Sequence, residues 1–292
     1  MIIRNTLNSF FLLILLLTGA TSCEKFKGDQ TIPAYLKIDS IYLSTEYYAQ
    51  GTASHQITDA WVYIDDYSMG AFELPAKLPA LYQGKHKVMI WPGIKRDGIG
   101  ATRTVYEFYS PITREVTFTE DSTSSMGVLK TTYQSTTLFS WKEDFESISV
   151  SLDTTDRSLT AIRLTAPGSP DTFEGNHSGW VVLDTANNFF ECQSHEEYAI
   201  PASTVYLELN FNISNSMIVG VFTYSDLMVY QSPIITLNPT NDTWKKIYID
   251  LTTTLNAYSG MKTFRVYLYT FLDSGLEKST LLFDNFKVVT RK

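Results

Sequence analysis

The chain has 292 residues, with 31 acidic against 23 basic side chains and a formal net charge of −8. Aromatic residues are frequent at 14% and charged residues sparse at 18%, a composition that favours strands over helices. We do not expect nucleic-acid binding, because it needs clustered basic residues and the chain has no run of Lys and Arg.

The first 23 residues have the order of a secretory signal. Arg4 gives a positive start, residues 10–17 form an unbroken apolar run, and small residues lead up to Cys23. The apolar run is shorter than the roughly 20 residues that a membrane-spanning helix needs. We therefore predict a signal peptide over residues 1–22 and no transmembrane helix here.

A cysteine directly after small residues resembles the cleavage site of bacterial lipoproteins, although Ala20 stands where that family usually has Leu. The resemblance implies that Cys23 carries the lipid and that residues 23–32 form a lipidated tether. Glu24 and Asp29 loosely match the acidic surface-export signal of Bacteroidota lipoproteins, which implies an outer-membrane protein exposed at the cell surface. The alternative is a simple cleaved signal in which Cys23 has no role.

Residues 33–135 consist of short strand patterns separated by turn residues. Strands are predicted where β-branched and aromatic residues gather, and a hairpin loop where Asp, Ser and Gly gather at residues 65–70. The predicted strands are residues 35–44, 60–64, 86–91, 104–109 and 112–119. Pro75 and Pro79 keep their segment at a sheet edge or in extended coil. This spacing, without helices, predicts a small β-sandwich.

The passage Leu81-Tyr82-Gln83-Gly84-Lys85-His86-Lys87-Val88 resembles the Gly-then-strand passage of PEGA-like and immunoglobulin-like surface modules. That resemblance implies a module of this kind over residues 33–135. We expect the polar residues 120–126 to form a loosely structured segment near the end of the module. We place the domain boundary near Ser135.

The second domain is predicted over residues 136–292. Residues 205–213 alternate between apolar and polar side chains, which is typical of a half-buried strand. Four motifs, Asp-Phe-Glu from Asp144, Tyr-Leu-Glu-Leu from Tyr206, Trp-Lys-Lys-Ile-Tyr-Ile-Asp-Leu from Trp244 and Leu-Leu-Phe-Asp-Asn-Phe-Lys-Val from Leu281, together resemble carbohydrate-binding and galactose-binding-like jelly rolls. The whole chain is therefore expected to be all-β, a small β-sandwich followed by a jelly-roll β-sandwich.

Two carboxylates of this domain share strand parity with apolar neighbours. Glu146 and Asp284 are therefore expected to point toward the core, where a carboxylate must be paired or bind a cation. The resembled jelly rolls often hold a structural calcium between their first and last strands, which implies Asp144, Glu146 and Asp284 as its ligands. The alternative is hydrogen bonding of these carboxylates to backbone amides or basic side chains.

Aromatic side chains take the parity opposite the apolar core rows in the late strands. A row of rings on one sheet face can stack pyranose rings while nearby amides bind the hydroxyls. This pattern predicts a polysaccharide-binding face made of Tyr206, Asn210, Asn212, Tyr248, Tyr267 and Tyr269. The alternative is that loops or the first domain cover these rings.

The sequence shows no recognisable catalytic pattern. Its four histidines have no metal-ligand spacing, and neither a nucleophile elbow nor a phosphate-binding glycine loop occurs. Cys192 has Phe189 and Phe190 as near neighbours in sequence and is expected to be a buried small hydrophobe. We therefore expect a noncatalytic, lipid-anchored envelope protein that acts as an accessory or scaffold for a partner protein complex. The alternative function is a surface glycan-binding lipoprotein that serves polysaccharide capture and uptake.

Overall fold

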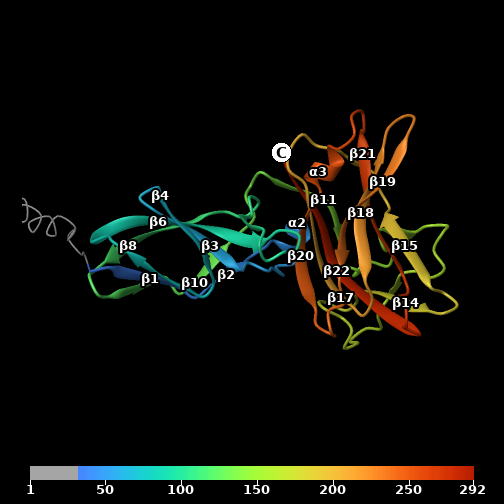
Figure 1. The fold of residues 1–292 in the computed structure, drawn as a ribbon, viewed down its shortest axis with the longest axis horizontal. Helices are drawn as coiled ribbons and strands as arrows, with labels where there is room; N and C mark the ends of the chain where they lie inside the picture. The colour runs from blue at the N-terminus through green and yellow to red at the C-terminus, as the bar shows by residue number, and fades with distance from the viewer. Residues whose placement is uncertain (1–31) are drawn as a thin grey trace, which may run out of the picture.

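The computed structural model describes residues 32–292, so the predicted signal segment and Cys23 lie outside the described residues. The chain is all-β, with a slender first sandwich whose end abuts the side of a broader second sandwich (Figure 1). Its two described helices, α2 (Tyr47–Gln50) and α3 (Thr252–Leu255), are single turns. Within residues 32–292 no helix has the length and apolar character to cross a membrane.

The first sandwich contains a five-stranded sheet, in which β4, β3, β6 and β7 follow in order and β8 also pairs with β6. A three-stranded sheet in the order β5-β1-β9 and the parallel pair β2 and β10 complete the module. Its strands are β1 (Ala34–Ile38), β2 (Ser40–Leu43), β3 (Asp59–Ile64), β4 (Tyr67–Glu73), β5 (Ala76–Ala80), β6 (Gly84–Lys95), β7 (Arg103–Val105), β8 (Ile112–Phe118), β9 (Thr123–Ser125) and β10 (Val128–Thr131).

Three expectations for this module were wrong in detail. The hairpin between β3 and β4 turns on Asp65 and Asp66 alone, both with positive φ, so that strand β4 already begins within the predicted loop. The predicted strand at residues 104–109 ends at Val105, because the aromatic residues after it pack against the second module. Residues 120–126 contain β9, which pairs with β1 in parallel.

The second sandwich is built from two six-stranded sheets. One has the order β13-β14-β22-β17-β20 with β11 also on β22, and the other has the order β12-β15-β21-β18-β19 with β16 also on β21. Their strands are β11 (Thr137–Glu143), β12 (Leu152–Thr154), β13 (Arg163–Leu164), β14 (Gly179–Asp184), β15 (Phe189–Ser194), β16 (Tyr198–Ala199), β17 (Tyr206–Ile213), β18 (Met217–Tyr224), β19 (Val229–Leu237), β20 (Lys245–Asp250), β21 (Thr263–Phe271) and β22 (Lys278–Arg291). We call these the β22 sheet and the β21 sheet.

Alternating apolar residues of both sheets meet in one core between them. The long strand β22 holds the β22 sheet together, because it pairs with β14 along its first half, with β11 along its second half and with β17 on its other side. The predicted boundary near Ser135 lies between β10 and β11.

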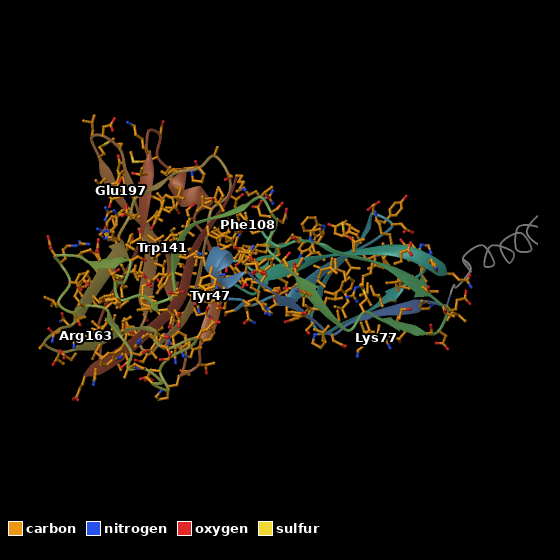
Figure 2. All side chains as sticks on the ribbon, turned by 180° about the vertical axis from the view of Figure 1, so that it is seen from behind. Tyr47, Lys77, Phe108, Trp141, Arg163 and Glu197 are labelled. Carbon is orange, nitrogen blue, oxygen red and sulfur yellow. The ribbon has the colours of Figure 1, made fainter. Side chains whose placement is uncertain are left out.

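The two modules share a continuous buried junction. The turn after β6 lies along the edge strand β20, where the amide of Asp97 donates to the carbonyl of Tyr248 at 2.8 Å and the amide of Asp250 donates to the carboxylate of Asp97 at 2.9 Å. Tyr206 and Tyr248 from the β22 sheet pack within the core of the first module. Figure 2 shows side chains of both modules filling the region between the labelled Phe108 and Tyr47.

A buried polar cluster lies at the centre of this junction. The carboxylate of Glu208 on β17 accepts hydrogen bonds from the hydroxyls of Tyr106 at 2.8 Å and Tyr133 at 2.9 Å, and lies 3.1 Å from the ammonium of Lys246. Burial alone would raise the pKa of Glu208, but the charges of Lys246 and Lys287 and the tyrosine hydrogen bonds together lower it. The ionised carboxylate therefore connects residues of both modules.

Candidate functional site

The structure divides the predicted sugar-binding residues between two sheets. Tyr206, Asn210, Asn212 and Tyr248 belong to the β22 sheet, whereas Tyr267 and Tyr269 belong to the β21 sheet. The expectation of one shared platform was therefore wrong, because strands of equal side-chain parity face opposite ways when they lie in opposing sheets.

The residues on the β22 sheet face the first module. Tyr206 is 6% exposed and Tyr248 is 1% exposed, and both rings contact Tyr106 at centroid distances of 5.3 and 4.8 Å. Asn210 is buried and donates to the hydroxyl of Ser54 at 2.9 Å. Asn212, on the same strand, accepts a hydrogen bond from Thr240. The first domain therefore covers the two tyrosines, which is the alternative that the sequence left open.

The outer face of the β21 sheet carries a row of six aromatic rings. Strand pairing places Phe189 beside Phe271 and Gln193 beside Tyr267, so the outward positions of β15 and β21 lie next to one another. Consecutive ring centroids in the row lie between 4.4 and 6.5 Å apart. We call this row the aromatic stripe, and it consists of Phe271, Phe189, Tyr269, Tyr267, Phe222 and Tyr224.

Exposure varies along the aromatic stripe. Phe271 at one end is 60% exposed and Tyr269 is half-buried, whereas Tyr267 in the middle is fully buried. Tyr267 packs against Gly220, where a Cβ atom would come within 2.6 Å of its ring. Burial raises the pKa of Tyr267, and its hydroxyl finds no hydrogen-bond partner among the described residues.

A polar network explains why a ring on the outer face is buried. Glu191 on β15 accepts hydrogen bonds from Arg157 Nε at 3.1 Å and from Gln231 Nε2 at 3.0 Å. Strands β21 and β18 lie between β15 and β19, the strand that carries Gln231, so these side chains meet above Tyr267. We call the three residues the polar arch.

The polar arch and the exposed end of the aromatic stripe line an open cavity of about 310 Å³. Its lining combines aromatic rings with an amide, a guanidinium and a carboxylate. Aromatic faces stack on the apolar faces of sugar rings, and planar polar groups bind hydroxyls, so this combination suits a carbohydrate. Its lining consists of Arg157, Phe189, Glu191, Gln231, Pro233, Tyr267, Tyr269 and Phe271.

Sequence reasoning found two rings of this cavity and missed the arch. Tyr267 and Tyr269 follow from the alternation of β21. Phe189 and Glu191 also alternate with the inward Phe190 and Cys192, and that pattern would have indicated an outward aromatic and acidic pair. Arg157 lies in the loop after β12 and carries no periodic signal.

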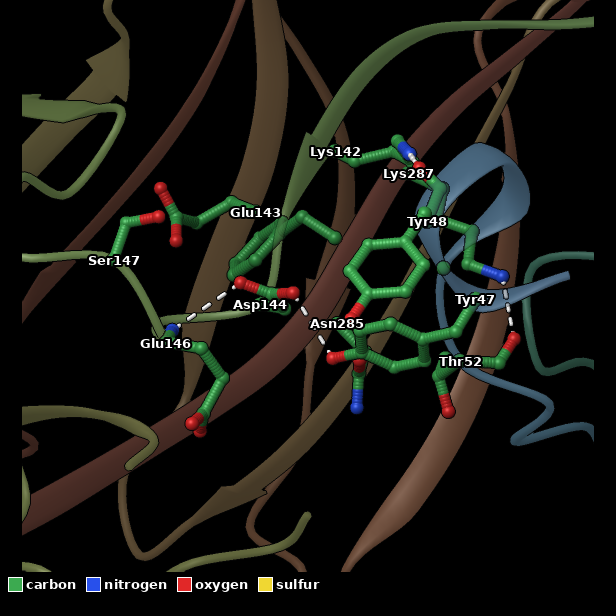
Figure 3. Close-up of a pocket in the computed structure, with 12 residues that line it drawn as sticks. Tyr47, Tyr48, Thr52, Lys142, Glu143, Asp144, Glu146, Ser147, Asn285 and Lys287 are labelled. Carbon is green, nitrogen blue, oxygen red and sulfur yellow. Dashed lines mark hydrogen bonds between the residues drawn. The ribbon is translucent and has the colours of Figure 1, made fainter. Parts of the chain in front are cut away.

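The predicted calcium ligands lie near a second cavity, of about 320 Å³, between α2 and the loop after β11 (Figure 3). Asp144 accepts hydrogen bonds from the hydroxyl of Tyr47 at 2.9 Å and the amide of Glu146 at 3.2 Å. Glu146 accepts from the amides of Asn176 and His177 at 2.8 and 2.9 Å. Its carboxylate is therefore held by backbone donors, as the alternative interpretation described.

The expectation that Glu146 lies on a core-facing strand was wrong. Residues 144–151 form a loop, and Ile148, expected to share an inward face, is fully exposed. Asp284 is 1% exposed, and Ser178 donates to its Oδ2 at 2.6 Å while its Oδ1 has no partner among the described residues. Burial raises the pKa of Asp284 to about 7.

These carboxylates do not converge as a metal site in residues 32–292, where no three His, Cys, Asp or Glu side chains are placed to share an ion. Of these three carboxylates, only Asp284 has a buried oxygen, Oδ1, without a hydrogen-bond partner among residues 32–292. Calcium binding by Asp144, Glu146 and Asp284 therefore stays a prediction.

No known protein-family model matches this chain, and no curated protein matches it. Solved structures that are similar to it include the CBM22-2 xylan-binding domain from Paenibacillus barcinonensis Xyn10C, with 15% identity, a TM-score of 0.36, and coverage of 52% of this chain and 99% of that one. A carbohydrate-binding module of the β-sandwich superfamily matches at 12% identity and a TM-score of 0.36, covering 80% and 85%.

A third similar structure, the CBM61 module from a complex with β-1,4-galactotriose, matches at 13% identity and a TM-score of 0.32, covering 48% and 87%. At scores this low, the ligand of the present chain has to be argued from its own residues.

Proposed function

We propose that this protein is a noncatalytic carbohydrate-binding protein whose ligand lies against the aromatic stripe of the β21 sheet. The observation that carries the proposal is the end of the stripe where the exposed Phe271, the half-buried Tyr269 and the buried Phe189 line the same cavity as the polar arch. Stacking supplies affinity for the flat faces of sugar rings, and the arch supplies donors and acceptors for hydroxyls.

The first module supports this function as a spacer. The first strand, β1, begins at the end of the first sandwich far from the second (Figure 1). The buried junction fixes the β22 sheet against the first module, and the β21 sheet forms the opposite layer of the second sandwich. A carbohydrate chain can therefore reach the stripe without passing the first module.

Affinity electrophoresis through gels containing single polysaccharides tests the proposal on soluble protein from Glu24 to Lys292. We expect retardation by at least one β-linked polysaccharide and its loss in Tyr269→Ala and Phe271→Ala. Tyr67→Ala is a matched control, because Tyr67 is 72% exposed on the first module. Retardation that survives both stripe variants, or that no polysaccharide in a broad panel produces, would overturn the proposal.

The proposed location is the outer membrane, with a lipid on Cys23. Its support is the signal-like order of the first 23 residues. Stable anchoring needs more than one acyl chain, which a lipoprotein cysteine carries. We expect palmitate to label the wild-type protein in cells and not Cys23→Ala, and equal labelling of the two would contradict the anchor.

A second candidate function is docking of a partner protein, the scaffold role expected from the sequence. The observation that favours it is the tip between β18 and β19, where Leu227 is 91% exposed and is followed by the exposed Met228 and Val229. Exposed apolar side chains in sequence are typical of protein contacts. Leu227→Asp would abolish co-purification of an envelope partner if this tip were the docking surface, and would leave polysaccharide binding unchanged.

A further inference from the structure

A cavity of about 430 Å³ lies at the junction of the two modules, away from the aromatic stripe. The first module contributes Gln56 and Thr58 from the segment before β3, Lys95 at the end of β6, and Asp97 and Gly98 from the turn that follows. The second module contributes the edge strand β20 with the preceding Trp244, and the end of β19. Junctions between domains are preferred positions for small-molecule sites.

Lysines outnumber acidic residues in the lining of this cavity. Lys95, Lys245 and Lys246 line it together with Asp97, and the ammonium of Lys246 is paired with the Glu208 carboxylate at 3.1 Å. Lys95 lies 3.6 Å from Glu73, whereas Lys245 is exposed and forms no ion pair within residues 32–292. The amide of Asp250 already occupies one oxygen of Asp97. An anion would therefore meet the unneutralised positive charge of Lys245 here.

A buried polar atom next to a lining residue lacks a partner. The side chain of Lys246 is 2% exposed, and its Nζ is paired with the Glu208 carboxylate at 3.1 Å. Asn210, opposite Lys246 in the β17–β20 register, has a buried Oδ1 without a partner. Such atoms are rare in folded proteins and indicate that a further polar group completes them.

The remaining lining suits a sugar ring. Trp244 is half-buried with its ring 5.1 Å from that of Phe173, so its orientation is fixed by packing. The side chains of Gln56 and Asn238 add amide donors and acceptors to the lining. An aromatic face with amides and ammonium groups combines stacking, hydroxyl binding and charge pairing.

We propose that the junction cavity binds an acidic saccharide, a sugar residue that carries a carboxylate or a sulfate ester. Lys245 pairs with the anionic group, and Trp244 packs on the ring. The site is separate from the aromatic stripe, so this proposal does not depend on the proposed function and can be tested separately.

Isothermal titration of the folded two-module protein with galacturonic acid, galactose 6-sulfate and galactose tests this site. We expect binding of one or both anionic sugars, at least tenfold weaker binding of neutral galactose, and further weakening as sodium chloride screens the charges. A heat of binding with galacturonic acid but not with galactose 6-sulfate identifies a carboxylate ligand, and the reverse result identifies a sulfate ligand.

Variants assign the binding to this cavity. Lys245→Gln should weaken binding of the anionic sugar at least fivefold, and Trp244→Ala should weaken it as well. Lys278→Gln removes the same charge from an exposed position at the start of β22 and should leave affinity unchanged. Phe271→Ala, which tests the stripe, should also leave it unchanged.

Three results would overturn the proposal: no heat with either anionic sugar, equal affinity for galactose, or equal effects of Lys245→Gln and Lys278→Gln. Because Lys245 is exposed, its substitution leaves folding intact, and thermal melting checks this for each variant.

Discussion

The hydroxyl of Tyr133 donates to Oε1 of Glu208 at 2.9 Å, which joins the segment between the modules to strand β17 of the β22 sheet. Tyr106 donates to the same oxygen from the first module, and Lys246 lies beside the other. An ionised, fully buried carboxylate with partners in both modules makes the junction part of the folded core rather than a flexible hinge.

Glu208→Ala should therefore destabilise the whole protein. It leaves Lys246 and Lys287 buried without their counter-charge, which typically costs about 3–5 kcal/mol. Urea unfolding followed by tryptophan fluorescence measures this as a lower midpoint. Glu120→Ala, at an exposed turn, is the control, and equal midpoints for the two variants would show that the cluster contributes nothing.

Gly220→Ala should displace Tyr267 from its place in the aromatic stripe. The new Cβ would lie 2.6 Å from Cζ of Tyr267 and against the carbonyl of Ser232, so either the ring or the strand must move. Overpacking of this kind costs about 1–3 kcal/mol of the free energy of unfolding.

The loss of stability can be measured by denaturant titration, and polysaccharide retardation should weaken with it. Gly100→Ala is the matched control, since a Cβ there meets nothing within 4 Å. A variant at Gly220 as stable as that control would contradict the packing described here.

The buried carboxyl of Asp284 should make stability depend on pH. Burial raises its pKa to about 7 from an ordinary value of 3.8. Below about pH 4 the carboxyl is protonated in both the folded and the unfolded chain. Its burial therefore does not lower the free energy of unfolding at that pH. As pH rises toward 7 the unfolded chain releases the proton more readily, and stability falls through this window.

Asp284→Asn should remove that fall. The difference between wild type and variant amounts to a few kcal/mol, since one pKa unit corresponds to about 1.4 kcal/mol. Thermal melting between pH 4 and pH 8, without divalent cations, compares the two slopes. Parallel curves for both proteins would mean that Asp284 titrates normally.

Calcium offers a separate test of the same residue. If Asp284 ligates the ion, millimolar calcium should raise the melting temperature at pH 7.5, because a ligand that binds only the folded state stabilises it. The rise should disappear with a chelator and in Asp284→Asn, while Asp226→Asn, at an exposed loop, keeps it. Identical melting temperatures with calcium and with chelator would contradict the prediction of calcium binding.

Local patterns in the sequence determined the fold class. The alternation of residues 205–213 correctly predicted the strand β17, and turn residues marked most strand ends, because side-chain period and backbone preference act over a few residues. The expectation that β17 is half-buried was wrong, because the first module covers its polar face as well. The same reasoning failed at residues 104–109 and around Glu146. The aromatic residues of the first segment leave the sheet to pack on another module, and Glu146 is held in a loop by amides 30 residues away.

Tertiary structure alone decided which aromatic residues are accessible. Tyr248 and Tyr269 have the same alternation, yet one is buried between the modules and the other lines an open cavity, because their strands lie in opposing sheets. The polar arch joins Arg157, Glu191 and Gln231 across 74 residues of sequence, and the junction cavity combines residues from both modules. Periodicity fixes which side of a strand a residue occupies, while only the packing of sheets and modules determines what lies on that side.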